Sequence, residues 1–159
     1  MIELPSIEIP GFTDDFLFTL QTRGFLPVLA HPERHPVLAK QPQILKEWLE
    51  RGMLVQLNAG SLTGRMGAQV MKFAGRLVTN RMVHLIGSDG HGINNRRPII
   101  NAAVATITKL IGAEAAERIC RMNPSKVLQD QDLELPETDA VEMFRANKKL
   151  FGFWRRSEI

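Results

Sequence analysis

The sequence has a single cysteine among 159 residues, and it has no apolar run that approaches the roughly 20 residues of a membrane-spanning helix. Because Cys120 has no partner within the chain, a secreted scaffold held by intrachain disulfides is excluded. The first residues, Met1 to Pro5, lack the charged start and the apolar stretch of a signal peptide. We therefore expect a cytoplasmic protein without membrane insertion.

Several common catalytic motifs are also missing. The sequence contains no Walker loop, no Gly-x-Gly-x-x-Gly fingerprint and no Cys-x5-Arg phosphate loop. Ser61 lies in Asn-Ala-Gly-Ser, which does not match the Gly-x-Ser-x-Gly nucleophile elbow. We expect Ser61 to cap or orient a loop, and we expect Cys120, which lies among apolar neighbours in a predicted helix, to take no part in chemistry.

The charge is nearly balanced, with 20 Lys and Arg against 17 Asp and Glu, and the composition is that of one ordinary globular domain. One basic and aromatic cluster stands out near the end of the chain, formed by Lys148, Lys149, Phe151, Phe153, Trp154, Arg155 and Arg156. Such a segment can contact an acidic surface, a membrane or nucleic acid. No nucleic-acid-binding motif accompanies it, so we favour a solvated terminal segment whose aromatic side chains pack on the domain, and we expect no nucleic-acid partner.

Short apolar runs alternate along the chain with longer amphipathic segments. The pattern predicts strands at residues 2–4, 25–30, 53–57 and 83–86. It predicts helices at residues 13–23, 43–51, 67–79, 99–111 and 113–122, a short helical turn from Asn123, and a last helix from 138 to about 150. This alternation indicates an α/β fold in which helices cover a parallel sheet. The polar stretch from Gln129 divides the chain into a domain at 1–128 and a linker with a terminal helix at 129–159.

Polar residues recur where the predicted strands end. Glu3 lies on the first strand, and the later strands are followed by His31, by Asn58 and Ser61, and by Asp89 and His91. Parallel sheets place their chemistry beyond the carboxyl ends of their strands, so these side chains are expected at one rim. Asp89 alone could be a helix cap and His31 alone a turn residue, but two imidazoles and two carboxylates together favour a site for zinc, manganese or iron. We place His84 in the core and expect His35 to be exposed.

Arginines accompany these residues. Arg34 follows His31 by three positions, and Arg96 and Arg97 follow the Asp-x-His turn. A planar guanidinium binds two phosphate oxygens at once, so arginines at a metal rim indicate a phosphate ester as substrate. A surface salt bridge is the alternative interpretation for one of Arg96 and Arg97.

The segments that carry these residues resemble one known family. They are IELP at 2–5, GFLPVLAHPER at 24–34, LVQLNAGSLTG at 54–64, LIGSDGH at 85–91, RRP at 96–98 and MNPSKVL at 122–128. Together they resemble the CpsB/CapC-type manganese-dependent tyrosine phosphatases of bacterial capsule and exopolysaccharide loci, in the polymerase and histidinol phosphatase (PHP) superfamily. The resemblance implies part of a distorted (β/α)7 barrel with a three-metal cluster. It also implies attack on phosphotyrosine by a metal-bound hydroxide, without a covalent phosphoenzyme.

The resemblance also assigns roles to single residues. Glu3 is expected to bridge the first two ions, His31 to bind the second, Asp89 the first and His91 the third. Arg34 and Arg96 are expected to hold the phosphoryl group. The implied metal is Mn²⁺, with iron or zinc as alternatives, and the implied substrate is the phosphotyrosine tail of a polysaccharide co-polymerase kinase.

The sequence departs from the family pattern at one point. The family has a His-x-His strand, an acidic loop and a further metal-binding histidine before the equivalent of Glu3, and no counterpart stands in this sequence. We therefore expect the C-terminal portion of such an enzyme, with an incomplete metal cluster, weak or no activity alone, and an exposed sheet edge open to self-association. Two alternatives stay open, a phosphoesterase for a small molecule such as histidinol phosphate and a non-catalytic phosphate-binding module.

Overall fold

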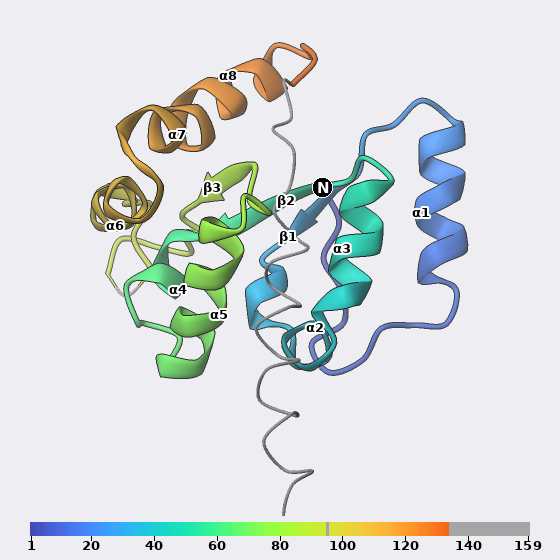
Figure 1. Cartoon of the computed structure of the whole chain (residues 1–159), viewed down its shortest axis with the longest axis horizontal. Helices are drawn as coiled ribbons and strands as arrows, with labels where there is room; N and C mark the ends of the chain where they lie inside the picture. Colours follow the sequence, from blue (N-terminus) through green and yellow to red (C-terminus); the bar gives the residue numbers. More distant parts are fainter. Residues whose placement is uncertain (95, 134–159) are drawn as a thin grey trace, which may run out of the picture.

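The computed structural model of the chain describes residues 1–94 and 96–133 (Figure 1). Its sheet has three parallel strands in the order β1 (Val28–Ala30), β2 (Leu54–Asn58) and β3 (Leu85–Gly87). The predicted α/β class and parallel pairing are confirmed, although each strand covers only part of its apolar run or is shifted by a residue or two. The predicted helix at 138–150 and the basic, aromatic cluster lie outside the described residues, and the division of the chain at 128/129 stays a prediction.

The predicted strand at residues 2–4 is reduced to one bridge. The N–H of Ile2 donates to the Val28 carbonyl at 2.8 Å, and the N–H of Ala30 donates to the Ile2 carbonyl at 2.8 Å. Pro5 has no N–H to extend this pairing, which is a physical reason for so short a contact. The bridge still has a consequence for function, because it brings Glu3 to the end of β1.

Helices fill most of the remaining chain. They are α1 (Thr13–Thr22), α2 (Pro36–Lys40), α3 (Pro42–Glu50), α4 (Ala59–Leu62), α5 (Ala68–Thr79), α6 (Asn101–Ile111), α7 (Ala113–Glu117) and α8 (Asn123–Leu128), with a 3₁₀ turn η1 (Pro32–Arg34) and a π-helical segment η2 (Arg118–Met122). The predicted helices at 13–23, 43–51, 67–79 and 99–111 are confirmed within two residues. The short helices α2 and α4 were not predicted, and the predicted helix at 113–122 divides into α7 and η2.

Two prolines explain why α2 and α3 are separate. Pro36 and Pro42 each lie in the first turn of a helix, where the missing N–H costs nothing. The residue before Pro42 is disfavoured in the helical region, and Gln41 accordingly has φ −127° and ψ 64°. A single residue, Gln41, therefore separates α2 from α3.

The two faces of the sheet bury different side chains. Leu29, Val55, Leu57 and Ile86 belong to a large core that also contains Trp48 of α3, Phe73 and Leu77 of α5 and Ile107 of α6. The opposite face carries the smaller cluster of Val28, Leu54 and Leu85, against which Leu133 packs. Side chains of α3, α5 and α6 thus all enter the large core, whereas none of them belongs to the smaller cluster. The core therefore fixes the strands, and their carboxyl ends define one rim.

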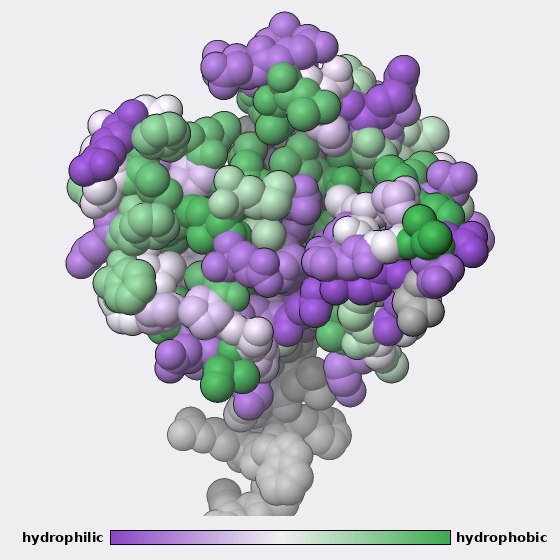
Figure 2. All heavy atoms as spheres, turned by 180° about the vertical axis from the view of Figure 1, so that it is seen from behind, coloured by the Kyte–Doolittle hydropathy of each residue, from purple (hydrophilic) through white to green (hydrophobic). Residues whose placement is uncertain are grey.

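The surface is a mixture of polar and apolar side chains. Figure 2 shows green apolar groups interspersed with purple hydrophilic ones on the face opposite to that of Figure 1. Strand β3 pairs only with β2 within the described part of the chain, so self-association through a sheet edge stays a prediction. In the same part of the chain, every helix is too short or too polar to cross a bilayer.

Candidate functional site

The rim is formed by the turns that follow the three strands. His31 follows β1, Asn58 ends β2 and Asp89 follows β3 by two residues. His31 has φ +36° and Asp89 has φ +49°, both in the left-handed region that side chains other than glycine rarely adopt. Such a conformation costs on the order of 1 kcal/mol and persists only where the surrounding structure holds it in place. Residues in this conformation are common at functional sites. Two of the four predicted metal ligands therefore have strained backbones.

Asp89 lies at the centre of a polar cluster. Its Oδ2 accepts hydrogen bonds from Asn58 Nδ2 at 2.8 Å, from Arg34 Nη1 at 3.2 Å and from the guanidinium of Arg96. His91 Nδ1 lies 3.6 Å from Asp89 Oδ1 and 2.9 Å from the Asp89 carbonyl oxygen. One carboxylate thus stands between two guanidinium groups, so the cluster of Arg34, Asp89 and Arg96 by itself has a net positive charge.

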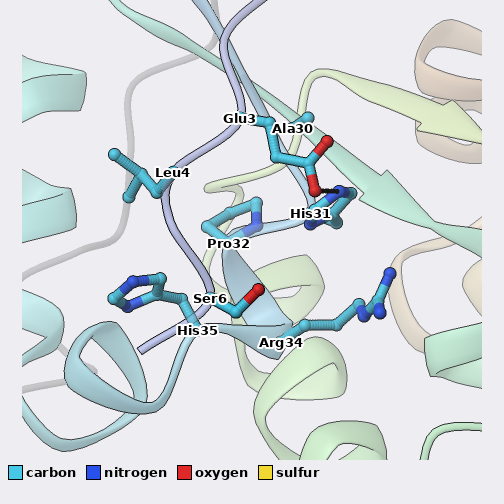
Figure 3. Close-up of a pocket in the computed structure, with 8 residues that line it drawn as sticks. All are labelled: Glu3, Leu4, Ser6, Ala30, His31, Pro32, Arg34 and His35. Atoms are coloured by element: carbon cyan, nitrogen blue, oxygen red, sulfur yellow. Dashed lines mark ion pairs between the residues drawn. The ribbon is translucent and has the colours of Figure 1, made fainter. Parts of the chain in front are cut away.

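Glu3 and His31 form a second pair at the same rim. Figure 3 shows the Glu3 carboxylate descending from the N-terminal segment to the His31 ring, and Oε1 lies 3.2 Å from Nε2. The two side chains border a pocket of about 90 Å³ that Ser6 and Arg34 also line. The Glu3 side chain is 69% exposed, whereas that of His31 is 15% exposed. The imidazole is therefore held by the fold, and the carboxylate stands open at the pocket edge.

These donors do not by themselves form a complete metal centre. Within residues 1–94 and 96–133, no three His, Cys, Asp or Glu side chains gather as one group able to hold an ion. The four predicted ligands instead form two pairs, Glu3 with His31 and Asp89 with His91. A catalytic zinc-type site commonly has three protein ligands for each ion. The described donors have suitable chemistry for a divalent metal, but they are too few to hold one alone.

Of the two adjacent arginines after the Asp-x-His turn, only Arg96 contacts Asp89. Arg97 Nε donates to the Ile93 carbonyl at 2.8 Å and braces its own loop. The loop is closed by His91 N–H, which donates to the Arg96 carbonyl at 2.8 Å. This hydrogen bond places Arg96 next to Asp89. The two arginines that are expected to bind phosphate, Arg34 and Arg96, therefore lie at the same carboxylate.

The most deeply buried carboxylate of the site, Glu33, is not predicted from the sequence. Glu33 is 1% exposed, and its Oε1 accepts hydrogen bonds from Ser61 Oγ at 2.6 Å and from the Asn58 N–H at 3.1 Å. Burial raises the pKa of Glu33 to about 7, against the opposing effect of these hydrogen bonds and of Arg34. In the sequence alone, a buried glutamate in a turn after a strand cannot be distinguished from a solvent-exposed one. The expectation that Ser61 orients a loop is confirmed by its bond to Glu33.

The expected exposure of His35 is wrong. His35 is 6% exposed, and its Nε2 lies 2.9 Å from the Pro5 carbonyl oxygen and 3.2 Å from that of Glu8. The N-terminal segment folds over this ring, and a position after a turn gives no indication of such a distant contact. His35 therefore anchors the segment that carries Glu3 to the rim.

Two other titratable side chains lie where the sequence placed them. His84 is 3% exposed, and its Nδ1 accepts a hydrogen bond from the Val55 N–H at 3.0 Å, so its core placement is confirmed. Burial lowers the pKa of His84 to about 4 and raises the pKa of the Cys120 thiol to about 11. The Cys120 thiol is thus protonated near neutral pH and is a poor nucleophile.

Comparison with known proteins decides the family. The sequence model of CpsB/CapC, described as capsular polysaccharide synthesis, matches residues 2–129. The chain belongs to the CpsB/CapC family. The resemblance inferred from the HPER and SDGH segments is therefore confirmed.

Individual family members cover most of the chain. Tyrosine-protein phosphatase YwqE of Bacillus subtilis is 30% identical over 154 residues, which are 97% of this chain and 59% of that protein. Tyrosine-protein phosphatase CpsB of Streptococcus pneumoniae is 29% identical over 113 residues, which are 68% of this chain and 46% of that protein. The chain therefore spans about half the length of these curated relatives.

A solved structure shows the same fold. It comes from crystal structures of YwqE from Bacillus subtilis and CpsB from Streptococcus pneumoniae, described as unique metal-dependent tyrosine phosphatases. The superposition has a TM-score of 0.81 at 30% identity and covers 87% of this chain and 56% of that one. The mixed α/β architecture of the chain, a small parallel sheet with helices, is thus that of these phosphatases.

Proposed function

We propose that this chain is the part of a metal-dependent protein-tyrosine phosphatase that binds the phosphoryl group and supplies some of the metal ligands. The proposal is carried by one observation, the closure of Arg34 and Arg96 on Asp89 where the strands end. The family relatives are named as tyrosine phosphatases, and the solved structure is described as metal-dependent, which supports the same function here.

Charge explains how the site would select its substrate. The cluster of Arg34, Asp89 and Arg96 contains two guanidinium groups for one carboxylate, and a phosphate monoester is a dianion near neutral pH. Guanidinium groups hold phosphate oxygens in a planar, bidentate geometry. The Arg34 and Arg96 side chains are each about one-third exposed, so an entering phosphoryl group can reach them without unfolding the rim.

We further propose Glu3, His31, Asp89 and His91 as ligands of divalent metal, with Mn²⁺ favoured over iron or zinc. Because the described donors form two pairs, we expect the chain alone to be a weak or inactive phosphatase. We also propose that its sheet corresponds to part of a PHP-type barrel. The proposed substrate is the phosphotyrosine tail of a polysaccharide co-polymerase kinase, met in the cytoplasm.

The incomplete donor set also favours a second candidate function. A module that retains the phosphate-binding arginines but binds no catalytic metal would recognise phosphorylated proteins without hydrolysing them. The two candidates differ in one measurable property, the metal content of the purified chain.

The test combines hydrolysis with metal analysis. The purified chain is assayed on p-nitrophenyl phosphate and on a phosphotyrosine peptide, with Mn²⁺ and after chelation. Slow hydrolysis that requires the metal and is lost in Arg34→Ala, but kept in Arg97→Ala, supports the phosphatase. Phosphate binding with no hydrolysis and near-zero bound metal supports the binding module instead, and rapid turnover like that of the full-length relatives would show that the donor set is not limiting.

A further inference from the structure

The carboxylate of Glu33 connects two segments beneath the rim. Glu33 lies in η1, which a single residue separates from β1, and the two groups that it binds lie where β2 passes into α4, since Asn58 is the last residue of β2 and Ser61 belongs to α4. These groups are the N–H of Asn58, at 3.1 Å, and the hydroxyl of Ser61, at 2.6 Å, and both donate to the same oxygen, Oε1. Glu33, Asn58 and Ser61 are each at most 1% exposed, so water does not compete for these bonds.

Asn58 passes this connection on to Asp89. Its backbone N–H binds Glu33, while its side-chain Nδ2 donates to Asp89 Oδ2 at 2.8 Å. The same Oδ2 accepts from Arg34 and Arg96. Glu33 is therefore connected to the rim in two ways. It precedes Arg34 in the chain, and it binds Asn58, whose side chain donates to Asp89.

We propose that Glu33 is a positioning residue, which holds the junction of β2 and α4 so that Asn58 keeps Asp89 between Arg34 and Arg96. The inference rests on the proposed function, because the property that Glu33 controls is the geometry of the phosphate-binding arginines. The hydrogen bonds that the Glu33 carboxylate accepts come from Asn58 and Ser61, and neither of these is a proposed metal ligand or a phosphate-binding arginine. Burying a carboxylate costs free energy unless it is hydrogen-bonded, and both donors to Glu33 Oε1 come from the junction of β2 and α4, while Oε2 is buried without a hydrogen-bond partner among the described residues.

Conservative and non-conservative variants separate positioning from direct participation. Glu33→Gln keeps an acceptor oxygen for Ser61 and for the Asn58 N–H, and it removes the ionisable group. Glu33→Leu has a similar volume but leaves both donors without an acceptor. Ser61→Ala deletes one of the two bonds and leaves Glu33 in place. Glu47→Leu, at an exposed position of α3, is the matched control for an apolar substitution of a glutamate.

The first measurements on the full chain are the dissociation constant of inorganic phosphate, by calorimetry, and KM and kcat for p-nitrophenyl phosphate with Mn²⁺. We expect Glu33→Leu and Ser61→Ala to raise the phosphate Kd and the KM at least fivefold, and Glu33→Gln to stay within twofold of the parent. A merely structural role would lower kcat in proportion to the folded fraction and leave KM and Kd unchanged. Glu47→Leu should change neither constant.

A second measurement does not depend on catalysis. The ¹H–¹⁵N signals of the arginine Nε groups, assigned with Arg34→Lys and Arg96→Lys, report the ion pairs with Asp89 in the free chain. We expect the signals of Arg34 and Arg96 to shift in Ser61→Ala and to keep their positions in Glu33→Gln. This comparison decides the proposal even if Glu33→Leu does not fold or the parent chain hydrolyses nothing. Unchanged arginine signals in folded Ser61→Ala, or a loss in Glu33→Gln as large as that in Glu33→Leu, would overturn it.

Discussion

Arg34 and Asp89 are 55 residues apart in the sequence, and their side chains meet with Nη1 3.2 Å from Oδ2. They meet because β1 and β3 are both parallel neighbours of β2, so the turns after the strands share one edge of the sheet. Both side chains are partly exposed, and an ion pair in such a place contributes little to stability. The pair therefore contributes little to the stability of the fold, and we attribute its role to the proposed binding of the phosphoryl group.

The first prediction concerns the shape of the Arg34 side chain. Arg34→Lys keeps the positive charge but replaces a planar group with a point charge, which cannot hold Asp89 and a phosphate oxygen in the same geometry. We expect the phosphate Kd to rise about tenfold, or about 1.4 kcal/mol, and the thermal stability to change little. Calorimetric titration with phosphate measures the first quantity and circular dichroism the second. Arg97→Lys is the control, since the Arg97 side chain donates to the Ile93 carbonyl and not to Asp89, and equal losses in both variants would contradict the assignment.

The second prediction concerns metal removal. None of Glu3, His31, Asp89 and His91 belongs to the buried core, which consists of apolar side chains from the sheet and helices. Chelation should therefore abolish any hydrolysis and leave the far-ultraviolet circular dichroism spectrum unchanged. Parallel assays with a chelator, and then with Mn²⁺ restored, check both parts. Loss of helical signal on chelation would show that metal binding is coupled to folding, contrary to this expectation.

The sequence was most informative where one physical pattern persisted over a long segment. Helices α5 and α6 follow continuous apolar stripes and were predicted within two residues. The residues after β1 and β3 were placed at one rim because parallel strands end at the same edge. Both inferences use only periodicity and topology, which a single sequence displays directly.

Contacts between distant segments were the part that the sequence did not reveal. The burial of Glu33 depends on Ser61 and Asn58, and the burial of His35 depends on the carbonyl groups of Pro5 and Glu8. Each is a polar side chain in a turn, a context in which solvent exposure is the usual outcome. Only the packed fold supplies the partners that make such burial possible.

The third prediction tests the attachment of α1 to α3. The indole N–H of the buried Trp48 donates to Asp14 Oδ1 at 2.7 Å, and Arg51 lies 3.3 Å from the same oxygen. Asp14→Ala should lower the free energy of unfolding by about 1 kcal/mol, because the indole loses its acceptor. Asp15→Ala is the matched control, since it removes the same charge from the same turn of α1 without touching Trp48. Urea unfolding followed by circular dichroism measures both, and equal losses would attribute the effect to the helix terminus instead.

The fourth prediction concerns the pH dependence of stability at His84. Burial holds the pKa of His84 at about 4 in the folded chain, below the ordinary value of 6.5. The unfolded chain therefore binds more protons between these values, so the contribution is fully present above pH 6.5 and is lost as the pH falls through 4. The difference corresponds to roughly 3 kcal/mol at most. Unfolding measured in urea at several pH values between 7 and 4 reports this loss as a falling midpoint.

His84→Asn isolates that contribution from other titrating groups. An asparagine Oδ1 can accept the bond from the Val55 N–H that His84 Nδ1 accepts, and it does not titrate. Glu33 has the opposite effect, because its raised pKa of about 7 makes stability fall as the pH rises from 4.5 to 7. Since Glu33 is present in both proteins, its effect cancels in the difference between parent and variant. The variant should therefore lose less stability than the parent on acidification, and parallel pH profiles would show that His84 does not titrate in this range.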